Sequence, residues 1–177
     1  MNRRDCLLGM ATGLATGWLS PLAWAATTDA RTASGVAIGA AWRGPQPTDP
    51  YFAGVLEADW AEKRLSIRYA VPLPTRPHGL IAEAAGGLTI CGVRPGTWIM
   101  RCDGAGKVIR QVRLDEEGET RLGGHAVVSA DGARLLATGT DFRTGQGRIV
   151  VRDRASLKKL DEWPTHGIDP HQLLLDG

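Results

Sequence analysis

The sequence predicts an all-β protein made of repeated four-stranded antiparallel units. Three observations indicate this class. The 177 residues include 23 glycines and 10 prolines, which favour tight turns and short strands over long helices. His78, His125 and His171 recur at intervals of 47 and 46 residues. Turn pairs such as Asp-Gly and Pro-Gly separate short apolar runs. A period in the forties with several short strands is typical of the blades of a β-propeller.

The unit that starts at His125 shows the pattern most clearly. A first strand is expected directly after this histidine, and an Ala-Asp-Gly-Ala turn follows it. The four strands of the unit are expected at 126–129, 134–139, 148–153 and 157–163. Glycine supplies the positive φ that the tight turns between them require.

The unit that starts at His78 repeats the same order. A Gly-Gly pair and a Pro-Gly pair mark its first two turns. Its strands are expected at 80–82, 88–91, 98–103 and 108–114.

The N-terminal unit is incomplete. Segments 36–42, 51–59 and 65–71 resemble the second, third and fourth strands of the other units, and no first strand precedes them. In a closed propeller the other end of the chain would donate that strand. The C-terminal segment, Leu173 to Gly177, resembles the first strand of a further blade.

The predicted domain is therefore a partial propeller of about three and a quarter blades. The blades are expected at 36–77, 78–124 and 125–170, with the start of the next at 171–177. Closed propellers need at least four blades. We therefore expect either a fragment of a larger ring or, if the chain naturally ends at Gly177, a protein that self-associates or assembles with another chain.

Residues 1–25 predict an export signal. Arg3 and Arg4 precede a weakly apolar run from Leu7 to Trp24, which ends in the small-x-small pattern Ala23-Trp24-Ala25. Paired arginines before such a run are typical of a twin-arginine signal, with the Sec route as the alternative.

A buried N-terminal helix is the other interpretation of this end of the chain, but no helical pattern continues past Pro21. We expect a signal helix, a flexible linker at 26–35, and a periplasmic mature protein without a stable membrane anchor.

The charge of the chain argues against nucleic-acid binding. Its 21 Lys and Arg residues are interspersed with 19 Asp and Glu residues, which gives a formal net charge of +2. Proteins that bind phosphate backbones carry a basic patch or stripe, and none is present here.

The histidines are the candidate site. His78, His125, His166 and His171 are all expected at or just before an innermost strand, where successive blades converge on the central channel. Together they could bind a metal ion or haem iron, with Asp169 as a further ligand or as a partner of a ligand. The alternative is a structural role, in which a histidine ties strands together within its blade. His125 suits that role best, and His166 and His171 are the better ligand candidates.

The remaining motifs of the sequence do not indicate a catalytic activity. Cys91 and Cys102 could pair in an oxidising compartment or could simply pack; a tight turn at Pro95-Gly96 would place Cys91 opposite residue 100 rather than 102. The acidic run at 115–119 and the loop at 141–147 suggest exposed turns rather than cation sites. The sequence contains no nucleophile elbow and no phosphate-binding loop.

The chain carries two resemblances to known proteins. The segment from Gly124-His125 through Ser129-Ala130-Asp131-Gly132 to Asp153 resembles a WD-type repeat that lacks the closing Trp-Asp. Nearly the whole chain resembles an exported bacterial family, domain of unknown function 1513. That resemblance rests on the twin-arginine start, Arg76-Pro77-His78-Gly79-Leu80, the 124–132 segment and above all His166-Gly167-Ile168-Asp169-Pro170-His171.

The family resemblance implies a seven-bladed propeller, longer than this chain, encoded beside periplasmic iron-uptake proteins. It implies no catalytic activity. We expect a periplasmic binding or scaffold protein that serves iron or haem uptake. The alternatives are a propeller hydrolase or oxidoreductase that uses the histidine rim, and a platform for protein interaction.

Overall fold

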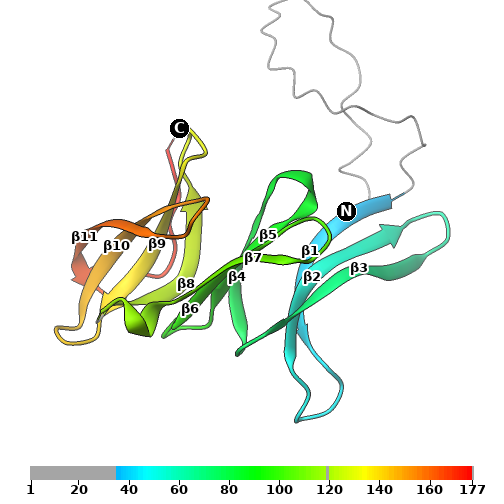
Figure 1. The fold of residues 1–177 in the computed structure, drawn as a ribbon, viewed down its shortest axis with the longest axis horizontal. Helices are drawn as coiled ribbons and strands as arrows, with labels where there is room; N and C mark the ends of the chain where they lie inside the picture. The colour runs from blue at the N-terminus through cyan, green and yellow to red at the C-terminus, as the bar shows by residue number, and fades with distance from the viewer. Residues whose placement is uncertain (1–34, 119, 177) are drawn as a thin grey trace, which may run out of the picture. The chain divides into compact units, whose positions relative to one another are not determined.

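The computed structural model describes residues 35–118 and 120–176, and these residues confirm the predicted all-β class. They form three antiparallel sheets, which we call the first, middle and third blades (Figure 1). The predicted signal at 1–25, with Arg3 and Arg4, and all but the last residue of the predicted linker lie outside the described part, as does Gly177. No helix in the described part is long and apolar enough to cross a membrane.

The first blade has three strands in the described part, as the sequence predicts. They are β1 (Gly35–Arg43), β2 (Tyr51–Asp59) and β3 (Arg64–Leu73). β2 lies in the centre, so β1 is an edge strand.

The middle blade has four strands in chain order. They are β4 (Pro77–Ala82), β5 (Leu88–Gly92), β6 (Trp98–Cys102) and β7 (Val108–Arg113). Every residue of β5 is buried, because the neighbouring blades cover both faces of this sheet. Two short 3-10 turns, Ala84–Gly86 and Leu114–Glu116, follow β4 and β7.

The third blade also has four strands in chain order. They are β8 (Thr120–Val128), β9 (Arg134–Asp141), β10 (Gln146–Asp153) and β11 (Lys159–Ile168). The expectation that its first strand starts after His125 is wrong, since β8 starts five residues earlier. The pairing of β8 with β9 changes register between Leu122 and Ala126, so the strand continues through an irregular Gly-Gly-His stretch. The segment after β11 runs to residue 176 without strand pairing.

Two apolar cores hold the three blades together. The first lies between the first and middle blades and includes Val55, Val71, Ile90 and Met100, all at most 4% exposed. The second lies between the middle and third blades and comprises Cys91, Ile99, Leu114, Leu122, Leu135, Ala137, Val150 and Leu157. Side chains thus leave the middle sheet alternately toward either neighbour, as the two-residue period of a strand dictates.

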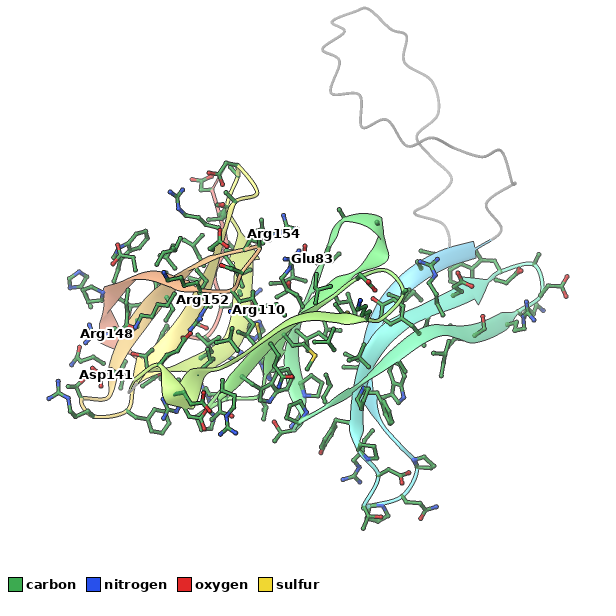
Figure 2. All side chains as sticks on the ribbon, viewed as in Figure 1. Glu83, Arg110, Asp141, Arg148, Arg152 and Arg154 are labelled. Atoms are coloured by element: carbon green, nitrogen blue, oxygen red, sulfur yellow. The ribbon has the colours of Figure 1, made fainter. Side chains whose placement is uncertain are left out.

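Charged side chains surround the second core. Glu83 after β4 accepts hydrogen bonds from Arg101 of β6 (3.1 Å) and from Arg154 of the third blade (3.0 Å). Arg110 donates to the carbonyl oxygen of Ser156 at 2.9 Å. The 2% exposed Arg152 pairs with Glu117. Figure 2 labels Glu83, Arg110, Arg152 and Arg154 where the middle and third blades meet.

The two cysteines in the described part of the chain are unpaired and face opposite cores. Cys91 lies in the second core and Cys102 in the first. Cys91 pairs with Ile99 across the sheet, not with the predicted residue 100. The reason is the length of the connection between β5 and β6, which has five residues where a Pro-Gly turn would have two. Because five is an odd number, the pairing of the two strands shifts by one residue.

Carboxylates of the loop at 141–147 and of the acidic run at 115–119 are paired with protein groups. Asp141 accepts hydrogen bonds from the backbone N–H groups of Arg143 (2.9 Å) and Thr144 (3.2 Å) and pairs with Arg148. This geometry is that of a capped hairpin loop. In the acidic run, Glu117 is held by Arg152.

Candidate metal site

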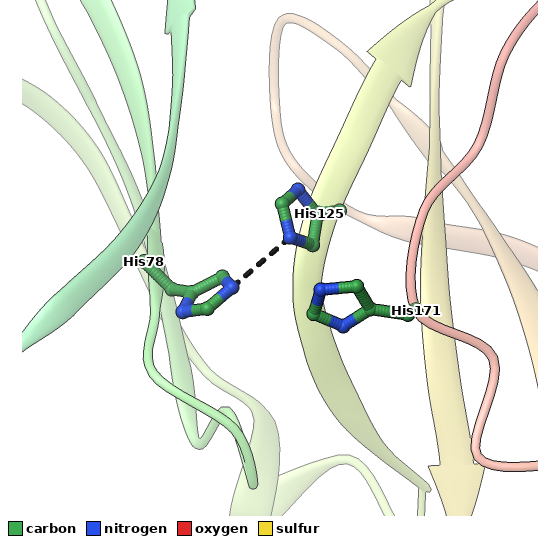
Figure 3. Close-up of side chains that lie close together, drawn as sticks. All are labelled: His78, His125 and His171. Atoms are coloured by element: carbon green, nitrogen blue, oxygen red, sulfur yellow. Dashed lines mark hydrogen bonds between the residues drawn. The ribbon is translucent and has the colours of Figure 1, made fainter.

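Three of the four predicted histidines come together. His78 lies on β4, His125 on β8 and His171 on the segment after β11. One ring nitrogen from each lies within 4.8 Å of the others, and Nε2 of His78 is 3.0 Å from Nε2 of His125 (Figure 3). We call these three side chains the histidine cluster. It joins the middle blade, the third blade and the segment beyond it.

Glycines allow this close approach. A Cβ on Gly79 would lie 2.2 Å from the carbonyl oxygen of Gly124, and a Cβ on Gly124 would lie 2.7–2.9 Å from three atoms of the His78 side chain. Gly124 also has a φ of +94°, which disfavours any other residue. The strands β4 and β8 can therefore bring their histidines together only because these two positions lack side chains.

The hydroxyl of Thr138 positions the other two histidines. This side chain is fully buried on β9. Its Oγ1 lies 3.1 Å from the carbonyl oxygen of His171 and 3.4 Å from that of His125. This hydroxyl thus lies between the backbone of β8 at His125 and that of the segment after β11 at His171, and it can donate its proton to either carbonyl oxygen. Sequence reasoning missed Thr138, because one threonine among the apolar and polar residues of β9 is no signal by itself.

Two imidazoles of the cluster, those of His78 and His125, favour their neutral form. Partial burial lowers the pKa of His78, and the charges of His171, Arg76 and Arg94 lower it further. Partial burial also lowers the pKa of His125, with further lowering by His78 and His171. The 3.0 Å contact joins one nitrogen that donates a proton to one that accepts it. Neutral imidazole is the form that ligates transition metals.

The spacing of the first two ligand atoms suits a metal ion. Two imidazole nitrogens that are each about 2.1 Å from one ion lie about 3.0–3.4 Å apart for angles between 90° and 110°. His78 and His125 already have this separation. The third ring needs a small movement, since its centroid lies 4.6 Å from that of His125 and 5.9 Å from that of His78.

His166 and Asp169 do not join the cluster. The prediction that His166 precedes an innermost strand is wrong, because it lies within β11, the last strand of the third blade. Asp169 pairs instead with Arg94 of the β5–β6 connection, with Nη1 and Oδ1 2.7 Å apart. The prediction placed these residues by their sequence distance from His171, and the chain reverses direction between β11 and that histidine.

A cavity of about 300 Å³ lies between the β5–β6 connection and the third blade. Its lining combines charged and polar side chains with apolar ones: Arg94, Pro95, Arg121, Leu122, Thr140, Phe142 and Asp169.

Comparison with known proteins places the chain in a family and names no activity for it. A search of curated proteins found no match. A solved structure of the dihydro-heme d1 dehydrogenase NirN in complex with DHE matches 78% of this chain and 29% of its own, at 14% identity and a TM-score of 0.49. The chain thus spans less than a third of that protein's length. Residues 71–177 match the family model described as "Protein of unknown function (DUF1513)". Because this match covers more than half of the sequence, the chain belongs to the DUF1513 family.

Proposed function

We propose that this chain is part of a periplasmic β-propeller that binds a transition-metal ion through His78, His125 and His171, and that it serves iron acquisition as a binding or scaffold protein. The observation that carries the proposal is the approach of three imidazole nitrogens to within 4.8 Å of one another. These histidines come from separate segments 47 and 46 residues apart, so the cluster depends on the fold and not on local sequence.

The ligand set favours an ion of the later transition series. Imidazole suits iron, copper, nickel and zinc, whereas magnesium and calcium prefer oxygen ligands. Three protein ligands leave at least one coordination position open. Haem iron takes one or two axial ligands, so three converging imidazoles suit a free ion better than haem. The iron part of the proposal comes from the family resemblance, which implies periplasmic iron-uptake partners.

Metal titration of the purified chain tests the site. We expect one Fe²⁺, Co²⁺ or Zn²⁺ per chain, with each of His78→Ala, His125→Ala and His171→Ala weakening binding at least 100-fold. His166→Ala is the matched control, because this exposed histidine lies outside the cluster; it should change the dissociation constant less than threefold. If the chain binds no metal at micromolar concentration, or if His166→Ala is as damaging as the other variants, the proposed site is wrong.

Export is tested separately. Replacing Arg3 and Arg4 together with lysine should retain the protein in the cytoplasm if the twin-arginine route carries it, and fractionation of cells measures this. Unchanged export would favour the Sec route.

A further inference from the structure

The three histidines of the cluster lie where the strand pairing is interrupted. His78 falls between the paired residues Pro77 and Gly79, at a register change in the pairing of β4 with β5. His125 falls within the register change of β8 against β9, and His171 lies on the unpaired segment after β11. Such irregularities re-aim side chains, but they leave the ladder without a hold on the residue concerned. Other contacts must therefore fix the three imidazoles relative to one another.

The backbone of the β5–β6 connection, residues 93–97, binds two of these segments directly. The N–H group of Val93 donates to the carbonyl oxygen of Arg76, at the entrance to β4 (2.9 Å). Gly96 and Leu122 exchange two hydrogen bonds of 2.7 and 3.1 Å, which join the connection to β8. The connection is thus held by main-chain bonds to both strands that carry histidines of the cluster.

A side chain of the same connection binds the third segment. Nη1 of Arg94 lies 2.7 Å from Oδ1 of Asp169. Asp169 is joined to His171 through Pro170, and Pro170 lies against Gly147 of β10, where an added Cβ would be 2.8 Å from the proline Cδ. Because the proline ring locks its own φ, a displacement of Asp169 is carried on to His171.

We infer that the β5–β6 connection positions the ligands of the metal site, and that Arg94 sets the place of His171 by holding Asp169. This role rests on the proposed metal site and deepens it, because it explains how the ligand on the unpaired segment is held. The Thr138 hydroxyl ties His171 to the third blade, whereas Arg94 ties the same segment to the middle blade. Arg94 is thus a positioning residue that acts on a bound metal ion through His171.

The exposure of the ion pair separates positioning from stability. The side chains of Arg94 and Asp169 are 46% and 57% exposed, and pairs this exposed add little to the stability of a fold. Loss of the pair should therefore leave the urea midpoint of unfolding nearly unchanged, while it frees the segment that carries His171. A variant that lowered this midpoint together with the metal affinity would show a merely structural role and would overturn the inference.

Cobalt titration of the full chain measures the effect, because the visible spectrum of Co²⁺ depends on its ligands. We expect Arg94→Gln to weaken cobalt binding about three- to tenfold, less than the loss of a direct partner of a ligand would cause. The spectrum of the bound ion should move toward that of His171→Ala. Arg94→Lys should retain most of the affinity, since a single nitrogen of Arg94 makes the contact and an ammonium can replace it.

Arg68→Gln is the matched control. Arg68 and Glu57 form an ion pair of 2.8 Å with similar exposure, 39% and 52%, on the first blade, which carries no residue of the cluster. Its loss removes an equivalent surface pair without touching the β5–β6 connection. The cobalt affinity and the spectrum should stay as in the wild-type chain.

A double-mutant cycle shows whether Arg94 acts through His171. In the His171→Ala background, Arg94→Gln should weaken cobalt binding no further, whereas independent contributions would multiply. The inference is overturned if Arg94→Gln weakens binding equally in both backgrounds or leaves the wild-type affinity unchanged. It is also overturned if Arg94→Gln tightens binding, since the released Asp169 would then be a ligand itself. In these cases the metal site stands; failure of the wild-type chain to bind cobalt would refute the site and the inference together.

Discussion

The two interfaces between blades are built differently. The first and middle blades meet through apolar side chains, and a hydrogen bond crosses at the margin, from the hydroxyl of Tyr69 to the carbonyl oxygen of Gly86 (2.8 Å). The middle and third blades share an apolar core of similar kind, but Glu83 and several arginines surround it, and the pair His78–His125 spans it.

The two kinds of interface contribute differently to the structure: one holds the blades together, and the other also fixes their relative position. Apolar contacts are favourable but non-directional, so they tolerate small shifts between two sheets. Charge-assisted hydrogen bonds fix distance and angle. The candidate site lies at the polar interface, where a metal ion would require its ligands to keep fixed positions. The apolar interface carries no residue of the cluster.

The largest expected effect comes from breaking the polar interface at Glu83. Its side chain is 7% exposed, and Arg101 and Arg154 are 17% and 23% exposed. Burial raises the pKa of Glu83, but hydrogen bonds from Thr89, Arg101 and Arg154 outweigh this and leave it below its usual value. Glu83→Gln should lower the free energy of unfolding by about 2–4 kcal/mol, somewhat less than for fully buried pairs because the arginines keep some solvent. Urea unfolding measures this.

Tyr69→Phe is the matched change at the apolar interface. It removes the hydrogen bond to Gly86 and should cost about 1–2 kcal/mol. If Tyr69→Phe destabilised the chain as much as Glu83→Gln, the two interfaces would not differ in the way proposed.

The second expected effect concerns backbone approach at the polar interface. Gly124 and Gly145 both have positive φ, +94° and +73°. A Cβ on Gly124 would collide with His78, whereas a Cβ on Gly145 would meet nothing within 4 Å. Gly145→Ala should therefore cost about 1 kcal/mol for backbone strain alone. Gly124→Ala should cost about 1–2 kcal/mol more, because β4 and β8 must move apart.

Metal titration of the same two variants sharpens the comparison. Gly124→Ala should weaken metal binding at least tenfold, and Gly145→Ala should leave it unchanged. Equal unfolding energies and equal metal affinities for the two variants would show that the close approach of the strands is not required.

The repeat could be predicted from the sequence because it is periodic. Glycine-containing turns and β-rich runs placed eight of the eleven described strands within two residues of their bounds in the structure. The spacing of His78, His125 and His171 also identified the three histidines that meet.

The errors arose where local irregularities decide the geometry. The register change at Gly123-Gly124 extends β8, and the five-residue loop after β5 shifts the partner of Cys91. His166 was grouped with its neighbour His171 although the chain turns between them. Thr138 and His171 lie 33 positions apart, and Glu83 and Arg154 lie 71 positions apart, so no local pattern reveals these contacts.

A smaller effect is expected from pH, and only at the polar interface. Because the pKa values of His78 and His125 lie below the unfolded value of about 6.5, the unfolded chain takes up protons first as pH falls. Stability is therefore full above about pH 6.5 and declines as pH falls from there through the folded pKa values. Both rings are partly exposed, so the loss should stay below about 1 kcal/mol.

Unfolding curves between pH 7.5 and 5.5, above the range where carboxylates titrate, measure how the free energy of unfolding changes with pH. His125→Gln should reduce the slope of this pH dependence, and His166→Gln should not. A slope that survives His125→Gln unchanged would place the pH dependence outside the histidine pair.

The smallest effect should appear in the reactivity of the two buried cysteines, which report on the two interfaces separately. Cys102 lies in the apolar interface and Cys91 in the polar one. Burial raises the pKa of the Cys91 thiol to about 12, so this thiol reacts only when the interface opens. In chains that retain one cysteine each, native labelling by a thiol reagent should be at least ~100-fold slower than in urea. Adding Glu83→Gln should then speed labelling of Cys91 more than that of Cys102, because it loosens the interface that Cys91 faces. Equal acceleration at both cysteines would mean that the blades open together, and that the contrast between the interfaces does not extend to their dynamics.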